Sequence, residues 1–170
     1  MRDGDIQRTA CCIRMMARID KQSAPRTDGC SYPQPYDEPC RSRVRHALGD
    51  VAGLTQFGVN LQRLAPGGWS SQRHWHSGED EFVWVVAGEV VLVTEDGEEV
   101  LRPGDCAGFK AGVANGHHLQ NRSDQEALLL EIGSRRPESD TVAYPDIDLL
   151  WTDATGDTHK DGRPYRSGKG

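Results

Sequence analysis

Several features that would assign this chain to a functional class are missing from its sequence. No apolar run approaches the roughly 18 residues that a membrane span needs. No run of lysine and arginine reaches the density of a nucleic-acid-binding surface, and the formal net charge is −6. The first residues, MRDGDIQRTACC, contain acids and no apolar segment, which argues against a secretory signal. We therefore expect neither a membrane nor a nucleic acid as partner.

Cysteine pairs are lacking too. The five cysteines include no CxxC pair, and four of the five precede residue 41. This odd count and spacing argue against a structural zinc site and against a full disulfide framework. We expect free thiols in the reducing cytoplasm, with a Cys30–Cys40 bridge as the less favoured alternative.

Helical periodicity is the third absence, since no segment keeps a period of 3.6 residues over ten residues. Short β-type runs such as EFVWVVAG (81–88) and EALLLEIG (126–133) appear instead, separated by turns such as EDGE (95–98) and RPGD (102–105). The 19 glycines among 170 residues suit a fold with many tight turns. The pattern predicts an all-β sandwich or barrel, and the length allows one domain.

The regions around the predicted barrel have a different composition. The start of the chain shows no sustained hydrophobic period, and a second hypothesis is that translation begins at Met16 and not at Met1. The stretch SYPQPYDEPC is proline-rich and should be extended, whereas YPDIDLLW, near the end, is expected to add one strand. We expect four segments: a poorly ordered N-terminal extension (1–30), an extended arm (31–50), the barrel (51–133), and a C-terminal strand with an irregular tail that packs on the barrel (134–170).

The stretch HWHSGEDE, residues 74–81, places two of the six histidines one residue apart, with three acids behind them. Alternate residues of a strand project to the same face, so His74 and His76 should point together. A turn through Ser77-Gly78 returns the chain and can bring Glu81 beside them. Two imidazoles and a carboxylate from adjacent strands form a facial site that suits iron, manganese, zinc, nickel or copper.

The spacing around this stretch is more specific than a histidine pair alone. Five, one, four and six residues separate, in turn, Gly68, His74, His76, Glu81 and Gly88. This resembles the first signature motif of the cupin superfamily with every position filled. The resemblance implies a single double-stranded β-helix, or jelly-roll, barrel. It also implies one divalent transition metal ion, of which iron, manganese, zinc and nickel are the candidates.

The same resemblance predicts a second motif that supplies one more histidine and runs from Gly-Asp through Pro-x-Gly to His-x-x-x-Asn. The chain has Gly104-Asp105, then Lys110 where the proline would stand, then HHLQN ending at Asn121. Counting back from Asn121 gives His117 as the fourth ligand, with two extra residues in the turn before the strand. A β-bulge at the start of this strand would select His118 instead, so both stay open, with His117 favoured.

The residues next to these ligands outline a pocket for a small molecule. Alternation places Gln72, Val83 and Val85 on its wall, and Phe109 beside them. Lys110 should lie at the rim, where it could attract an anionic substrate.

Three imidazoles and one carboxylate leave two positions of a six-coordinate ion open, as a reactive metal requires. Two enzyme classes fit: a dioxygenase that uses iron, and an isomerase or lyase that uses zinc or manganese as a Lewis acid. The segments YPDIDL and THKDGRPY resemble small, single-domain bacterial cupins, some of which are labelled sugar-phosphate isomerases; fold and metal alone do not fix the chemistry. No separate general base is identifiable. The alternative is a module that binds a small ligand, with or without metal, as a sensor or carrier.

One further pattern concerns assembly. By alternation, Trp75, Phe82 and Trp84 share the face opposite the ligands, where a strand would usually be polar. Aromatic side chains are enriched at protein interfaces, and large exposed apolar patches are unusual on monomers. We expect a homodimer that uses this face; coverage by the chain's own arm, PQPYDEPC, is the alternative.

Overall fold

The computed structural model describes residues 18–165, which fold into β-sheets with one short α-helix, α1 (Leu48–Val51). None of the helices in this part of the chain is long and apolar enough to cross a membrane. Three 3-10 helices are also present: η1 (Lys21–Ser23), η2 (Glu38–Cys40) and η3 (Pro137–Ser139). The strands are β1 (Arg26–Asp28), β2 (Val44–Ala47), β3 (Phe57–Leu64), β4 (Trp75–His76), β5 (Glu81–Ala87), β6 (Val90–Thr94), β7 (Gly97–Leu101), β8 (Cys106–Phe109), β9 (His118–Gln120), β10 (Ala127–Ser134), β11 (Thr141–Tyr144), β12 (Leu149–Thr152) and β13 (Gly156–Thr158).

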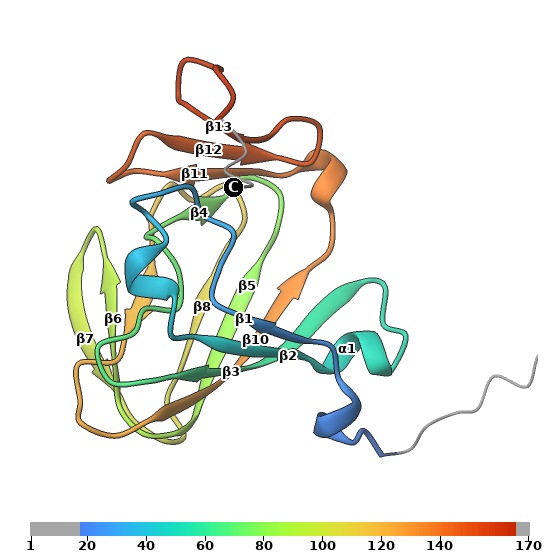
Figure 1. Cartoon of the computed structure of the whole chain (residues 1–170), viewed down its shortest axis with the longest axis vertical. Helices are drawn as coiled ribbons and strands as arrows, with labels where there is room; N and C mark the ends of the chain where they lie inside the picture. Colours follow the sequence, from blue (N-terminus) through green and yellow to red (C-terminus); the bar gives the residue numbers. More distant parts are fainter. Residues whose placement is uncertain (1–17, 166–170) are drawn as a thin grey trace, which may run out of the picture.

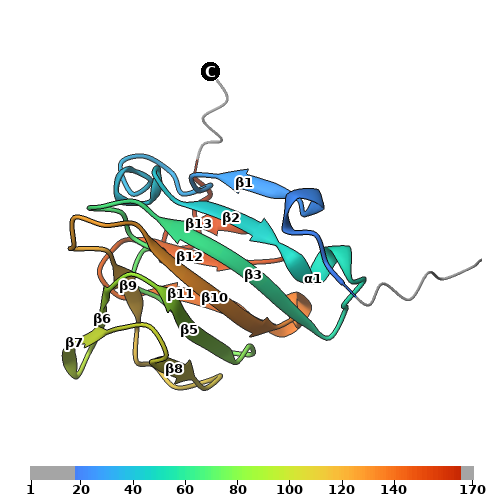
Figure 2. The same ribbon diagram turned by 90° about the horizontal axis from the view of Figure 1, so that it is seen from below.

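The barrel has a large and a small sheet. The large sheet runs in the order β1-β2-β3-β10-β5-β8, and the small sheet in the order β7-β6-β9 (Figures 1 and 2). Along β5 the burial alternates, with Val83 and Val85 buried while Phe82 and Trp84 are exposed. This period of two is the one read from the sequence, and it directs one face of the large sheet inward. The inward side chains form the core, which consists of Leu64, Val83, Val85, Val90, Leu92, Leu101, Leu119, Ala127 and Leu129. The all-β, jelly-roll expectation is confirmed.

A third sheet, ordered β13-β12-β11-β4, lies over one end of the barrel (Figure 1). The expectation of one C-terminal strand was wrong, because three strands form there. Val142, Tyr144 and Leu149 make a second small core in this sheet, against which Tyr32 packs. The three strands have only three or four residues each, and burial alternates in β11 alone, so the sequence gives little signal for three separate strands.

The N-terminal part is more structured than expected. Residues 26–28 form β1, which pairs antiparallel with β2, although 1–30 were expected to be poorly ordered. Residues 1–17, and with them the hypothesis of a start at Met16, lie outside the described residues. The segment 31–50 is not a continuous extended arm either, because it contains η2, β2 and α1. Pro39 lies in the first turn of η2, where a helix tolerates proline, so the prolines do not keep this segment extended throughout.

Close contacts with neighbouring atoms explain why glycine stands at the two glycine positions of the histidine-containing motif. Gly88 follows β5 with a φ of +76°, and a Cβ there would lie 2.6 Å from the carbonyl oxygen of Glu126. A Cβ at Gly68 would lie 2.7 Å from the hydroxyl oxygen of Ser42. Only glycine fits these close approaches, which fix both ends of the segment that carries the ligands.

Candidate metal site

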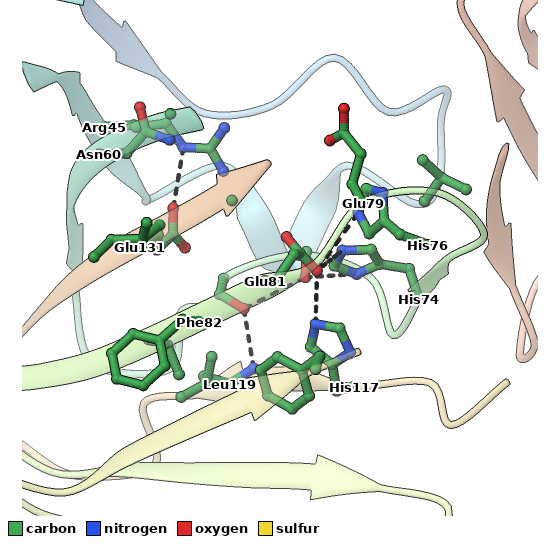
Figure 3. Close-up of a pocket in the computed structure, with 18 of the residues that line it drawn as sticks. Arg45, Asn60, His74, His76, Glu79, Glu81, Phe82, His117, Leu119 and Glu131 are labelled. Atoms are coloured by element: carbon green, nitrogen blue, oxygen red, sulfur yellow. Dashed lines mark hydrogen bonds and ion pairs between the residues drawn. The ribbon is translucent and has the colours of Figure 1, made fainter. Parts of the chain in front are cut away.

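Three histidines and one glutamate meet at the end of the barrel beneath the third sheet. Glu81 is the first residue of β5, and one of its carboxylate oxygens, Oε2, lies 3.5 Å from Nε2 of His74 and 3.5 Å from Nε2 of His76. Nε2 of His117 lies 2.9 Å from the same oxygen. Backbone hydrogen bonds in both directions between His74 and His117 hold the two loops together. Figure 3 shows the three imidazoles arranged around the Glu81 carboxylate.

The other ring nitrogen of two of these histidines has an acceptor. Nδ1 of His74 lies 2.9 Å from the carbonyl oxygen of Gln72, and Nδ1 of His76 lies 2.6 Å from Oδ2 of Asp140. Each contact favours the tautomer that carries its proton on Nδ1, so the lone pair of Nε2 faces Glu81. Contacts of this type orient imidazoles that bind metals. His117 is held differently, because its ring stacks on Phe109 with centroids 3.4 Å apart.

The electrostatics agree with a cation-binding role. Burial alone would raise the pKa of Glu81, but hydrogen bonds with His117 and His74 outweigh it and hold that pKa well below its usual range. Burial also lowers the pKa of His117, which favours its neutral form. For His74 the contact with Glu81 outweighs burial and raises the pKa. A carboxylate at the meeting point of three imidazoles attracts positive charge, which protons or a divalent metal ion can supply. Three nitrogen donors and one oxygen donor fit a divalent transition metal.

His118, the alternative to His117, lies elsewhere. It belongs to β9, and its Nδ1 lies 3.0 Å from the carbonyl oxygen of Ser71. Its ring packs edge-on against Trp69, with centroids 4.6 Å apart. Burial lowers the pKa of His118 to about 4, as expected of an imidazole inside the barrel. The extra residues of the second motif lie in the irregular stretch 110–116, and β9 keeps its register with β6.

A cavity of about 380 Å³ opens beside the four converging side chains. Val83 and Phe109 line it as expected, together with His74, His76, Glu81 and His117. Lys110 lines a second cavity of about 360 Å³, which Glu81, Phe109 and His117 also line.

Two expected wall residues do not line this cavity. The chain bends at residues 70–73, so strand alternation does not extend back to Gln72. Its side-chain amide instead donates to the carbonyl oxygen of Tyr36 at 2.6 Å. Val85 points into the barrel as expected, but it is completely buried in the core below the cavity. Strand alternation predicts the face to which a side chain points, but it does not predict how deep into the barrel the cavity extends.

The structure adds functional residues that sequence reasoning missed. Asp140, whose side chain is 1% exposed, contacts His76 from the loop that leads into β11. No local signal marks this aspartate, because it lies 64 residues from its partner. Alternation along β2 and β3 would also have placed a group of polar side chains on one face of the sheet. This group consists of Arg43, Arg45, Asn60 and, from β10, Glu131, and all four line the cavity.

Comparison with known proteins agrees with this architecture. Residues 60–133 match the family described as "Cupin domain". A sugar phosphate isomerase of the cupin superfamily from Silicibacter pomeroyi is 44% identical, with a TM-score of 0.81 over 88% of this chain and 97% of that one. A protein named as a candidate sugar phosphate isomerase from Acidithiobacillus ferrooxidans is 34% identical, with a TM-score of 0.61 over 65% and 69%.

More distant structures share only the fold. A polyketide cyclase from Streptomyces resistomycificus is 19% identical, with a TM-score of 0.60 over 77% of this chain and 86% of that one. No protein of curated function matches the chain. The relatives therefore establish ancestry and architecture, while the chemistry has to be argued from the site.

Proposed function

Because the chain belongs to the cupin superfamily and its histidines converge on one carboxylate, we propose that it binds one divalent transition metal ion with His74, His76, Glu81 and His117. The metal serves a reaction on a small polar molecule held in the adjoining cavity. The observation that carries this proposal is the placement of three Nε2 atoms within 3.5 Å of a single Glu81 oxygen. A metal ion bound there would act as a Lewis acid on an oxygen atom of the ligand.

An isomerase-type reaction has the most support. The Silicibacter pomeroyi and Acidithiobacillus ferrooxidans proteins, which are 44% and 34% identical, carry that name or a candidate form of it. The cavity wall is also polar, with three arginines, an asparagine and four carboxylates. A dioxygenase that uses iron is the second enzyme candidate, since an iron ion could also be held by three imidazoles and one carboxylate.

An isomerase must move a proton, and Asp157 of β13 is the side chain that we assign to this task. Asp157 lines the cavity, and its carboxylate has no hydrogen bond or ion pair with any other described residue. Burial raises its pKa, which makes its carboxylate a stronger base. Asp157 thus provides the general base that could not be recognised from the sequence.

Metal content is the decisive measurement. Tag-free protein analysed by inductively coupled plasma mass spectrometry should contain close to one transition metal per chain. His76→Ala and His117→Ala should lose it, whereas His118→Ala should retain it as the matched control. Wild type that stays free of metal after reconstitution would refute the proposal.

Turnover separates the two enzyme classes and the non-enzymatic alternative. Metal-loaded protein would be incubated with aldose and ketose phosphates in D₂O, and deuterium incorporation would be followed by NMR. Asp157→Asn should keep its metal and lose about 10²–10⁴ in rate. Oxygen uptake by the iron-loaded protein would favour the dioxygenase. Binding without any turnover would identify a sensor or carrier.

We also propose a homodimer that forms through the outer face of the large sheet. Phe82 and Trp84 are 36% and 45% exposed there. Trp75 does not share this face as expected, since β4 belongs to the third sheet. The arm 33–40 does not supply the cover for these aromatics in the way the alternative assumed: Tyr36 stacks edge-on against Tyr165, near the third sheet. Light scattering should give a dimer mass for wild type and a monomer mass for Trp84→Glu.

We also propose that the protein is located in the cytoplasm. Cys30 and Cys40 are both free, although their thiols are close enough to share a hydrogen bond. In a reducing compartment, neighbouring cysteines such as these stay free thiols and do not form a disulfide. Alkylation of the protein in intact cells, followed by mass spectrometry, would detect a bridge if the compartment were oxidising.

A further inference from the structure

The cavity has a second polar region across from the metal ligands. Arg43, Arg45, Asn60 and Glu131 form this distal pole. Figure 3 shows Arg45, Asn60 and Glu131 apart from the three histidines. Arg43 immediately precedes β2, Arg45 lies in β2, Asn60 in β3 and Glu131 in β10. In the large sheet β3 and β10 lie between β2 and β5, so the arginines are separated from the Glu81 strand by two strands.

The floor between the two poles carries no side chains at one row of the sheet. Gly58 of β3 and Gly133 of β10 are directly paired, and Gly133 is also paired with Glu81. Both glycines line the cavity. The side chain of Arg135 covers Gly58, where a Cβ would lie 3.4 Å from Nε of that arginine. Gly133 leaves the row beside Glu81 without a side chain of its own.

Arg45 has unused hydrogen-bonding capacity. Its guanidinium forms no hydrogen bond with any described residue, and its Nε is buried without a partner. The one charged group near it is Glu131, at 3.4 Å from Nε. Glu131 in turn accepts a hydrogen bond from the buried amide of Gln62, which fixes the carboxylate in place. A guanidinium offers five N–H donors in a planar fork, and Glu131, beside Nε, is the one charged partner that the described residues give to that of Arg45.

Arg43 adds a charge that no carboxylate neutralises. Its Nε donates to the carbonyl oxygen of Gly29 at 2.8 Å, and its Nη1 donates to that of Ser70. No acid among residues 18–165 lies within ion-pair distance of it. Two arginines against one glutamate leave the distal pole with an excess of one positive charge. The other acids of the wall are Glu79 in the loop before β5, Glu81 at the start of β5 and Asp157 of β13. The third arginine of the wall, Arg135, is ion-paired with Asp50.

We propose that the distal pole is an oxyanion-binding subsite in which the Arg45 guanidinium and the Asn60 amide receive a carboxylate or phosphate group. The substrate class is then a small molecule with an anionic group at one end and a hydroxyl or carbonyl oxygen at the other. Arg45 is the specificity-determining residue, and Glu131 is a positioning residue that holds it. This inference deepens the proposed function, on which it rests for the role of the metal end.

The test compares three five-carbon probes that differ in charge: D-ribose, D-ribonate and D-ribose 5-phosphate. Isothermal titration would be run on the full chain, both metal-free and zinc-loaded. Wild type should bind at least one anionic probe more than 10-fold tighter than ribose, and the preferred probe distinguishes carboxylate from phosphate. Arg45→Met should lose this preference by at least 10-fold while its metal content stays at the wild-type level. Arg63→Met, on the outer face of β3 and 47% exposed, is the matched control and should behave as wild type.

Two results would overturn the proposal: no preference for either anion in wild type, or an undiminished preference in Arg45→Met. If that variant is poorly folded, Arg45→Met combined with Glu131→Gln removes both charges together and should lose the preference in the same way. The charge preference is measured in metal-free protein as well. Failure of the metal site, seen as lost metal in wild type, is thereby distinguished from failure of the subsite.

Discussion

Replacing Asp140 by asparagine tests whether the carboxylate behind His76 tunes the metal site. Asp140 is 1% exposed, contacts Nδ1 of His76 at 2.6 Å and accepts the backbone N–H of Gly78 at 2.8 Å. Asparagine keeps the shape but has one acceptor oxygen, so one of these donors loses its partner. Partners of metal-binding histidines contribute about 10–100-fold in metal affinity. We therefore expect Asp140→Asn to bind metal about 10–100-fold more weakly, or about 1.4–2.7 kcal/mol.

Competition with a chromophoric chelator gives the affinity, and urea unfolding of the metal-free protein gives the stability. The unsatisfied donor should lower the free energy of unfolding by about 1–3 kcal/mol. The chain offers a matched control in Asp148→Asn. Asp148 contacts Nδ1 of His159 at 2.8 Å, but this pair is 52% and 26% exposed and lies outside the cavity. It should leave metal affinity unchanged.

The reasoning would be refuted in two ways. Folded Asp140→Asn could retain wild-type metal affinity, in which case the tautomer of His76 does not depend on Asp140. Alternatively, Asp148→Asn could weaken metal binding as much, in which case the effect is a general one of lost charge. Loss of affinity in the first variant alone supports the geometry.

Two further predictions concern Gly88, which follows β5, and Cys30, in the N-terminal part of the chain. Gly88→Ala should destabilise the fold by at least about 3 kcal/mol in urea unfolding, because a left-handed φ costs about 1–2 kcal/mol and the new Cβ meets backbone at 2.6 Å. Gly97→Ala, where a Cβ meets nothing within 4 Å, should lose only the cost of its positive φ, and equal losses would contradict the steric argument. For Cys30, the hydrogen bond from the Cys40 thiol, aided by Tyr32 and Arg43, outweighs burial and lowers the pKa to about 6. The thiolate forms as pH rises, so iodoacetamide labelling of Cys30 should increase through pH 6, and Cys40→Ala, which removes the donor, should move that midpoint upward; a midpoint near 8.5 in wild type would contradict the assignment.

The part of the site that could be predicted from the sequence is the part held by local geometry. His74, His76 and Glu81 lie within eight residues, and the alternation of two short strands is enough to bring them together. The barrel itself follows from the same alternation, as β5 shows. The choice of His117 over His118 required only that β9 keep its register.

The remainder could not be predicted because it depends on contacts between distant segments. Gln72 leaves the cavity because the chain bends at residues 70–73, and a bend of this kind has no signature in side-chain alternation. β1 forms in a stretch with no hydrophobic period because it completes the edge of a sheet whose other strands are already paired. Asp140 reaches His76 only after the third sheet has closed over the barrel.

The barrel and the segments on either side of it contribute different residues to the site, and this affects how function can be inferred in this family. Residues 60–133, which match the family, supply all four proposed metal ligands. Several groups of the cavity wall come from outside that range: Arg43 and Arg45 precede it, whereas Tyr144 and Asp157 follow it. On the proposed function, the barrel would supply the metal site, and the flanking segments would help to select the molecule that it acts on. The high coverage of the Silicibacter pomeroyi protein, 88% of this chain, includes most of these flanks, so a charge preference at Arg45 would be expected to hold in both proteins where that arginine is present.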